Sequence, residues 1–368
     1  MSVPASRIPL MRPKLPDATS IFPYLEEIDR NRRYSNFGPM ERLFEARLAG
    51  HFDLAEHQAV CVSNCTLGLE VSLRMTARYP SGYCLMPSFT FVATAHAAVS
   101  AGFEPYFLDV DPNTWALDPE AICNRLSRIQ GPIAAIMPVA PFGAPVEISR
   151  WTTFTRKTSI PVVLDAAASF DKAKGGRIPL VLSLHATKVL GIGEGGVVLC
   201  TNEELIKKIR AGRNFGFLEG RSANLPGTNA KLSEYNAAVG LAALDRWKVK
   251  RQANVMVARE YLDVFSGVSG LRFGPGFSKG AANSTCNVQF EAPIANRVIK
   301  RLDSMGIESR KWWNNGCHNE PNFLGCSGEE LQVTQFLADR VVGLPFFEEL
   351  NRPAIIRIRD AIESVMSR

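Results

Sequence analysis

The chain has 368 residues, with 42 Lys and Arg against 36 Asp and Glu, so its formal net charge is +6. Apolar residues make up 46% of the chain and charged residues 21%, which excludes an intrinsically disordered protein and leaves room for two domains. The small positive surplus suits an anionic small molecule but is too diffuse to indicate nucleic-acid binding.

Residues 1–20 contain no continuous apolar stretch, so we expect no signal peptide. The uncharged stretch 79–103 is long enough to cross a bilayer, but Pro87, His96 and two glycines within it favour strand, loop and buried helix. We therefore expect no membrane segment. The eight cysteines form no C-x-x-C pair and no cluster with histidines, which predicts reduced thiols, no metal site and a cytoplasmic location.

The first helical signal is an amphipathic stretch over residues 37–51. After it come short apolar runs rich in Val, Ile and Leu, most of them followed by a turn and a helix-like segment. Because the runs are continuous rather than alternating, they predict strands covered on both faces. Strands joined by helices predict an α/β fold with a mostly parallel central sheet flanked by helices. The predicted strands are 59–63, 83–87, 105–110, 133–139, 161–167, 180–186 and 195–200.

The pattern changes after residue 214. The glycine-rich segment 216–230 predicts an exposed loop, and a long helix is expected over 232–265. The remainder predicts a smaller α+β domain, so we divide the chain into a large domain of residues 1–245 and a small one of residues 246–368. The elements expected there are a strand at 287–291 and helices at 292–304, 328–341 and 353–367.

Ligands of parallel sheets bind at the carboxyl ends of the strands, so polar residues that close the apolar runs are site candidates. Lys188 follows one run and precedes a glycine-rich turn; an amine in a partly dry site has a lowered pKa and attacks aldehydes. Asp165 closes another run, where a carboxylate is costly unless it meets a cation such as a protonated pyridine nitrogen. A surface lysine and a turn-capping aspartate are the alternatives.

Small polar residues follow the first predicted strand and open a helix: Asn64, Cys65 and Thr66. The N-terminus of a helix presents free backbone N–H groups and the positive end of the helix dipole, which together suit a phosphate. An ordinary helix N-cap is the alternative. The segment therefore predicts a phosphate site only in combination with other features.

The combination of an Asp, a Lys 23 residues later and an upstream strand–polar–helix junction resembles a fold-type I enzyme dependent on pyridoxal 5'-phosphate (PLP). Over nearly its whole length the chain is similar to the DegT/StrS (DegT/DnrJ/StrS) family of PLP-dependent nucleotide-sugar aminotransferases. The motifs that carry the resemblance are SNCTLGLE (63–70), PSFTFVATAHA (87–97), PYFLDVDPNTW (105–115), LDAAASF (164–170), LHATK and GEGG within 184–196, GTNAKLSEYNAA (227–238) and GLPFF (343–347).

The resemblance implies that Lys188 binds PLP as an imine and that Asp165 pairs with its pyridine nitrogen. It also implies that Phe91 stacks on the cofactor ring. The phosphate-binding residues that it implies are Cys65, Thr66 and Ser183. Asn229 falls where the family reaches into the neighbouring subunit's site, which implies a homodimer with shared active sites.

The sequence departs from the family in three places. Ala168 stands where a Gln often contacts the cofactor, and Ala140 stands where a His is usual. Lys231 replaces the Arg of the family's N-x-R motif. The family's dehydratase offshoots replace the cofactor-binding lysine with histidine; here the lysine is present, which favours transamination. The substrate-binding candidates are His185, Arg310 and His318.

The resemblance implies an aminotransferase that converts a nucleotide-linked keto-deoxysugar, such as a dTDP- or UDP-4-keto-6-deoxyhexose, into an amino sugar for polysaccharide or glycoconjugate biosynthesis. Glutamate is the expected amino donor and 2-oxoglutarate its product, with the cofactor cycling through pyridoxamine 5'-phosphate. The alternatives are an aminotransferase of a cyclitol or an amino acid, and a non-catalytic regulatory protein with the same fold.

Overall fold

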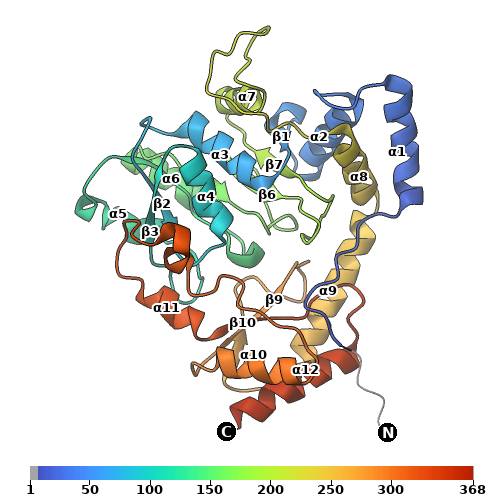
Figure 1. Ribbon diagram of the computed structural model, residues 1–368, viewed down its shortest axis with the longest axis vertical. Coiled ribbons are helices and arrows are strands. Elements are labelled where there is room, and N and C mark those ends of the chain that lie inside the picture. Colours follow the sequence, from blue (N-terminus) through green and yellow to red (C-terminus); the bar gives the residue numbers. More distant parts are fainter. Residues whose placement is uncertain (1–6, 368) are drawn as a thin grey trace.

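The computed structural model describes residues 7–367 (Figure 1). Residues 1–6, which belong to the segment where no signal peptide is expected, lie outside the described residues, as does residue 368. None of the helices within residues 7–367 combines the length and the apolar character that a membrane span requires.

The large N-terminal part alternates strands and helices. Its helices are α1 (Ala18–Asn31), α2 (Pro39–His51), α3 (Cys65–Thr76), α4 (Val92–Ser100), α5 (Pro119–Cys123), α6 (Ile148–Thr158), α7 (Glu203–Gly212) and α8 (Glu234–Asp245). Its strands are β1 (Ala59–Val62), β2 (Tyr83–Pro87), β3 (Glu104–Leu108), β4 (Ile133–Ile136), β5 (Leu164–Asp165), β6 (Leu180–Ser183) and β7 (Gly196–Leu199). Each strand expected from the apolar runs is therefore confirmed, most of them shorter than predicted.

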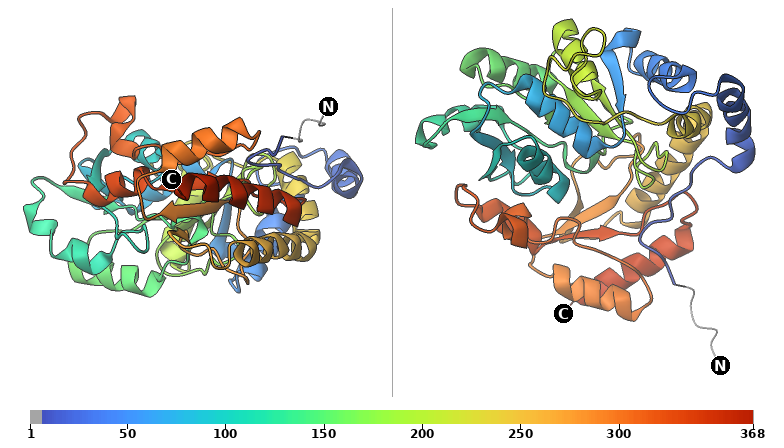
Figure 2. Two further views of the ribbon diagram at one scale, coloured as in Figure 1. Left: turned by 90° about the horizontal axis from the view of Figure 1, so that it is seen from below. Right: turned by 45° about the horizontal axis from the view of Figure 1, so that its top comes forward.

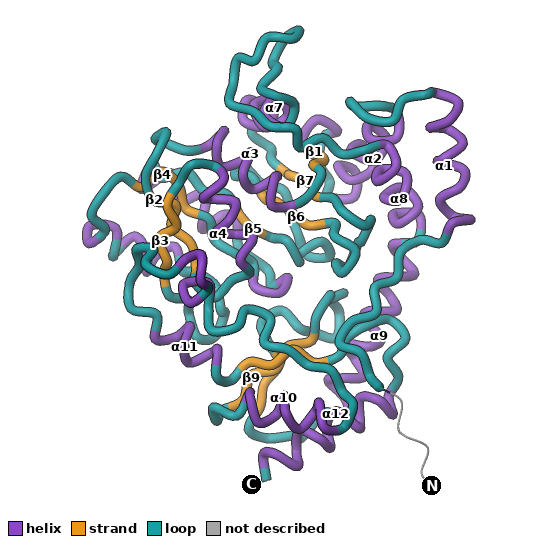
Figure 3. Tube along the Cα trace, in the orientation of Figure 1, coloured by secondary structure: helices purple, strands orange, loops and turns teal. Residues whose placement is uncertain are grey.

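These strands form one twisted layer at the centre of the large part (Figure 3). The order β3-β2-β4 is joined to β5-β6-β7-β1 by the parallel bridges Ile136–Val162 and Val139–Asp165. Neighbouring strands are parallel except at β7, which is antiparallel to both β1 and β6. The sheet is thus mostly parallel, as expected.

Both faces of this sheet are buried, because alternate residues of each strand point to opposite cores. In β1, Val60 and Val62 pack with α3, α4 and α7, whereas Ala59 and Cys61 pack with α2 and α8. In the β3-β2-β4 part of the sheet, Trp151 and Phe154 of α6 pack against β2 and β4. Burial on two sides is the physical reason why the strands are continuous apolar runs.

A buried ionic network fixes α2 and α8 against the edge of the sheet. Arg213 donates from one nitrogen to Glu41 and Glu45, both at 2.8 Å, and these three side chains are almost fully buried. The carboxylate of Glu234 accepts hydrogen bonds from the backbone N–H groups of Met40 and Glu41, which caps the N-terminus of α2. Two carboxylates, those of Glu41 and Glu45, therefore share one fully buried guanidinium.

The C-terminal part has its own small sheet, packed against helices. It comprises α9 (Trp247–Val264), β8 (Leu271–Phe273), β9 (Cys286–Phe290), α10 (Ala295–Ser304), α11 (Gln332–Ala338), β10 (Val341–Leu344) and α12 (Arg352–Met366). The strands are antiparallel in the order β10-β9-β8. Helices α10 and α12 lie side by side beneath this sheet (Figure 2). A separate apolar core holds these elements together except α11, whose Leu337 packs in the core beside β2 and β4.

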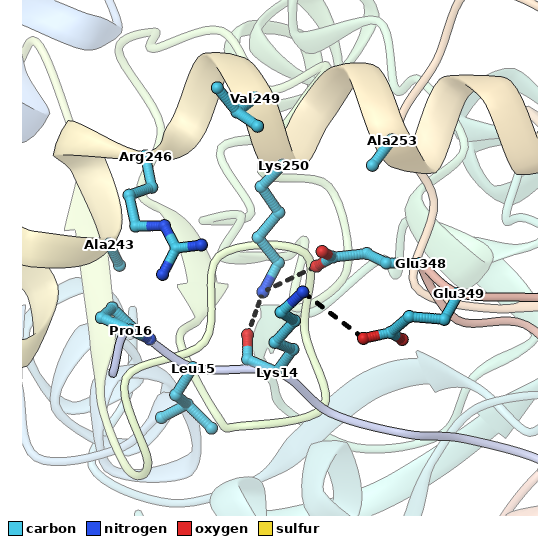
Figure 4. Close-up of a pocket in the computed structure, with 10 residues that line it drawn as sticks. All are labelled: Lys14, Leu15, Pro16, Ala243, Arg246, Val249, Lys250, Ala253, Glu348 and Glu349. Carbon is cyan, nitrogen blue, oxygen red and sulfur yellow. Dashed lines mark hydrogen bonds and ion pairs between the residues drawn. The ribbon is translucent and has the colours of Figure 1, made fainter. Parts of the chain in front are cut away.

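The N-terminal segment of residues 8–16, here called the N-terminal strap, joins the two parts. Ile8 pairs with Ile307, and the carbonyl of Leu10 accepts a hydrogen bond from the N–H of Phe346, so the strap begins against the C-terminal part. At its other end the carbonyl of Lys14 accepts a hydrogen bond from Lys250 of α9 (Figure 4). The strap thus runs across the junction from the C-terminal core toward α9.

Three expectations differ from the observed elements. The single helix expected over 232–265 is broken at Arg246, where the chain leaves the core under the large sheet and continues as α9 toward the C-terminal core. The helix expected over 328–341 is reduced to α11, because the following residues pair with β9. Helix α1 was not expected. The domain boundary at residues 245 and 246 stays a proposal.

The segment 216–230 is mostly exposed and projects beyond α7 (Figure 1). It is tied at its base by a bridge between Asn214 and Asn229. The expectation of an exposed loop is confirmed.

Candidate functional site

A cavity of about 680 Å³ lies at the carboxyl ends of the central strands, where the large sheet faces the C-terminal part. It collects polar residues from segments far apart in the sequence. The candidates that line it are Asn64, Cys65, Thr66, Phe91, Asp165, Ser183, His185 and Lys188. Most of the candidate residues therefore lie together in one cavity at the carboxyl ends of the strands, where ligands of parallel sheets bind.

Sheet register explains why these residues meet. Val62 at the end of β1 and Ser183 at the end of β6 both pair with Gly196 of β7. A Cβ atom on Gly196 would lie 2.9 Å from the backbone nitrogen of Cys65, closer than side chains approach a backbone atom. The absence of a side chain at this glycine lets the N-terminus of α3 sit directly against β7.

Asp165 is buried at the end of β5 and is held by hydrogen bonds. One carboxylate oxygen accepts from the hydroxyl of Thr94 at 2.8 Å and the other from the N–H of Ala167 at 3.1 Å. Burial raises the pKa of Asp165, while these donors and the nearby Lys188 lower it. A buried carboxylate with oriented donors is well placed to receive a cationic group of a ligand.

Lys188 lies in the turn after β6, where its N–H donates to the carbonyl of His185. Burial lowers the pKa of its amine, opposed by Cys65 and Asp165 nearby. Its ammonium nitrogen has no hydrogen bond to any side chain within residues 7–367. A lowered pKa increases the neutral fraction of the amine, which is the nucleophilic form.

The N-terminus of α3 forms one wall of the cavity. The side chain of Asn64 caps the helix by accepting from the N–H of Leu67 at 2.9 Å, and Cys65 and Thr66 form the first turn. Ser183 is buried beside them, and its oxygen accepts from the N–H of His185. Burial raises the pKa of Cys65 well above its ordinary value, so this residue is a neutral thiol rather than a nucleophile.

Aromatic rings also line the cavity. Phe91, the N-cap residue of α4, lines the cavity although 58% of its surface is exposed. Further along, Phe142 and Trp313 stack with ring centroids 3.9 Å apart, and Phe142 adopts a left-handed backbone conformation with φ 52°. A partly exposed ring in the cavity wall offers a flat surface on which a planar ligand can stack.

His185 is held in one tautomer at the rim. Its Nδ1 accepts from the N–H of Thr187 at 3.3 Å and lies 2.8 Å from the Thr187 hydroxyl, so the proton resides on Nε2. That nitrogen lies 3.7 Å from the carboxylate of Glu194. His185 therefore presents an oriented donor beside Lys188.

Three candidates do not line this cavity. Asn229 is exposed at the base of the 216–230 loop, where its oxygen accepts from Lys231 at 2.5 Å. The guanidinium of Arg310 stacks over Trp312. His318 lies 2.6 Å from the Ser88 hydroxyl and accepts from Asn319, so both ring nitrogens are already engaged.

Sequence reasoning missed several residues of the cavity. Thr187, which lines the cavity, directly precedes Lys188, and Thr94 of α4 lies behind the cavity wall, where it donates to Asp165. Both lie in quoted motifs but were not singled out. Met11 and Ser284 come from segments whose position depends on how the two parts pack together. Trp312 and Trp313, which follow the candidate Arg310 in the sequence, also line the cavity. Ala140 and Ala168, the two departures from the family pattern, also line the cavity.

The arrangement fits a phosphorylated pyridine aldehyde. The N-terminus of α3 suits the phosphate, Asp165 suits a ring cation, and the Phe91 ring suits stacking. Lys188 supplies an amine for the aldehyde. These features come from separate strands and helices, so their convergence is independent evidence for one ligand class.

Comparisons with known proteins agree with this geometry. The sequence profile described as the DegT/DnrJ/EryC1/StrS aminotransferase family matches residues 17–363. Protein Mb3436c of Mycobacterium bovis is 31% identical, over 97% of this chain and 90% of its own length. The dTDP-4-amino-4,6-dideoxy-D-glucose transaminase of Shigella dysenteriae is 33% identical, over 96% and 98%. The structure of DesI with its TDP-sugar product covers 98% of this chain and 93% of its own, with 27% identity and a TM-score of 0.87.

Proposed function

Because the chain belongs to the DegT/DnrJ/EryC1/StrS aminotransferase family and is a PLP-dependent aminotransferase, we propose that it transfers the amino group of glutamate to a nucleotide-linked keto-sugar. The proposed acceptor is a dTDP- or UDP-4-keto-6-deoxyhexose. The product would be an amino sugar for a polysaccharide or another glycoconjugate. The names of the Shigella dysenteriae relative and of DesI's bound product support this substrate class.

The observation that carries the proposal is that Lys188 and Asp165 line one cavity with the N-terminus of α3. When bound, PLP supplies an electron-withdrawing ring and an aldehyde that takes up the donor's amino group and, as pyridoxamine phosphate, passes it to a carbonyl. Lys188 would hold the cofactor between turnovers and move the proton on the donor's α-carbon. Asp165 would keep a positive charge on the ring nitrogen.

The size of the cavity supports a bulky acceptor. Its volume of about 680 Å³ lies in the upper half of the range of roughly 300–1,000 Å³ found for small-molecule sites. Trp312 and Trp313 also line the cavity, and their flat rings could contact a nucleoside base. The oriented Nε2–H of His185 would donate to an oxygen of the sugar.

We also propose the homodimer with shared sites. Asn229 does not line the cavity of its own subunit, and three aromatic residues, Tyr34, Phe215 and Tyr235, are exposed. Phe215 packs under the ammonium of Lys231, and Tyr34 stacks on Tyr235. Exposed aromatic residues are enriched at protein interfaces, so this surface supports a subunit contact that carries Asn229 to the neighbouring cavity.

The cytoplasm is the proposed location. All eight cysteines are free thiols, and six of them are buried. Unpaired cysteines are typical of a reducing compartment, which supports this assignment.

A half-reaction screen tests the proposed function. Glutamate first converts the holoenzyme to its pyridoxamine phosphate form. A panel of acceptors is then added while the absorbance of the bound cofactor is followed. Return of the original spectrum with nucleotide-linked 4-keto-6-deoxyhexoses supports the proposal. Return only with cyclitol ketones or with simple keto acids would assign one of the other substrate classes.

Lys188→Ala is the critical variant in this screen, and Lys157→Ala, an exposed lysine of α6, is its matched control. We expect the first to abolish the response to glutamate and the second to leave it unchanged. A normal response from Lys188→Ala would contradict the assigned role.

A further inference from the structure

A second, narrow pocket lies behind Lys188. Its volume is about 40 Å³, and it is formed where the N-terminal strap passes the turn of residues 186–189, helix α9 and residues 346–348. It shares Met11, Thr187, Lys188 and Ser284 with the main cavity, so it is a side arm of the same site. One water needs about 10–15 Å³, so the arm has room for a carboxylate but not for a sugar ring.

The basic groups of this arm differ in how far they are neutralised. The ammonium of Lys250 donates to the carbonyl of Lys14 at 2.8 Å and lies 3.6 Å from Glu348. The ammonium of Lys14 lies 3.4 Å from Glu349 (Figure 4). Both lysines are therefore paired with carboxylates, and together they pin the strap to α9 and to the segment that follows β10.

Besides Lys14, the strap contributes one more positively charged residue to the arm, Arg12. Its side chain is exposed, and within residues 7–367 it makes no hydrogen bond or ion pair. Ser284, which lines both the arm and the main cavity, is buried and its hydroxyl has no hydrogen-bond partner in the same range. An unpaired guanidinium and an unused hydroxyl thus border a carboxylate-sized space beside Lys188.

We propose that this arm binds the distal carboxylate of a dicarboxylic amino donor, with Arg12 as its charged partner and Ser284 as a second hydrogen-bond donor. The inference rests on the proposed function, in which glutamate supplies the amino group. Guanidinium and carboxylate groups match in geometry and charge. The acceptor is too large for the arm, so this subsite serves the donor alone and lets one active site accept two unlike substrates.

The variant Arg12→Gln tests this subsite in the donor half-reaction of the holoenzyme. We expect the KM for glutamate to rise about 10- to 100-fold, the effect of losing one hydrogen-bonded charge pair. The half-reaction with alanine, which lacks the distal carboxylate, should change less than about twofold. Arg12→Lys should restore part of the affinity for glutamate because it keeps the charge.

Arg7→Gln is the matched control. Arg7 lies just before the same strap and is exposed, but it pairs with Glu308 at 3.1 Å and does not line the arm. The KM of the Arg7→Gln variant for glutamate should equal that of the wild type. The KM for the keto-sugar in the second half-reaction should also be the same in Arg12→Gln and in the wild type.

The outcomes separate the inference from the proposed function. Suppose that glutamate converts the wild type. If Arg12→Gln then has the wild-type KM for glutamate, or if its KM rises equally for glutamate and alanine, the subsite is wrong and the proposed function stands. A wild type converted only by donors without a second carboxylate also overturns the subsite. If no amino donor converts the wild type, the proposed function itself fails.

Discussion

At Asp165, the hydroxyl of Thr94 is the strongest of the groups that oppose the effect of burial on the pKa of the carboxyl group. Thr94 is fully buried on α4 and donates to this carboxylate at 2.8 Å, while its own oxygen lies 2.8 Å from the hydroxyl of Thr90. These contacts oppose the effect of burial, which raises the pKa of Asp165. In the proposed function Asp165 must be ionised to pair with a ring cation, so the threonine would help to set the acid limit of activity.

The variant Thr94→Val should move that limit. Without the hydroxyl the pKa of Asp165 rises further, so the ascending limb of kcat/KM against pH should shift to higher pH. Leaving the carboxylate oxygen unpaired should also cost about 1–3 kcal/mol of folding stability. Thr76→Val is a matched control, since the Thr76 hydroxyl is buried without a partner in the described structure. An unshifted limb in Thr94→Val would remove the role given to this hydroxyl.

Glu41 gives a second residue-scale prediction. Burial, together with Glu45 and Glu234, raises its pKa from 4.5 to about 7, although Arg213 opposes the shift. Between these values the folded state binds more protons than the unfolded state, so the free energy of unfolding falls as pH rises through this window. We expect a loss of ~2–3 kcal/mol between about pH 5 and pH 8 from this group.

Glu41→Gln should flatten this dependence, as followed by urea unfolding at a series of pH values. Glu219→Gln, on the exposed loop, should keep the wild-type profile. A Glu41→Gln variant whose unfolding free energy falls with pH as steeply as that of the wild type would show that Glu41 is ionised throughout.

Among the elements, the contact between α3 and β7 is the one on which the proposed phosphate binding depends. The variant Gly196→Ala would place a Cβ atom 2.9 Å from the nitrogen of Cys65 and push the helix N-terminus away. We expect the affinity for PLP to fall at least tenfold, measured by titrating the apoprotein and following cofactor absorbance. Gly280→Ala is the control, because no atom lies within 4 Å of its added Cβ. Equal affinities in the two variants would contradict this role of the helix.

The elements also show what the sequence could predict. The seven strands were predictable because burial on both faces leaves an uninterrupted apolar signal, and Asp165 and Lys188 were identifiable because each follows such a run. Helix α1 was missed because Pro23 lies inside it and interrupts the helical pattern. The break at Arg246 has no glycine or proline to mark it. Thr94, Ser284 and Trp313 depend on tertiary packing, which local patterns do not encode.

For the whole molecule, the proposed exchange of Asn229 between subunits predicts complementation. In a mixed dimer of Lys188→Ala and Asn229→Ala, one site carries both defects and the other carries neither. Refolding the two variants together should recover about a quarter of wild-type activity, since about half of the dimers are mixed and each has one intact site. If mixing recovers no activity, Asn229 acts within its own subunit or not at all.

The N-terminal strap has a practical consequence for handling the protein. Met11 borders the main cavity, only three residues after the pairing of Ile8 with Ile307. A change that displaces the strap would therefore alter the wall of the cavity, whereas α12 packs in the C-terminal core and contributes no residue to the cavity. Protein prepared for kinetics should therefore carry its affinity tag after α12, at the C-terminus.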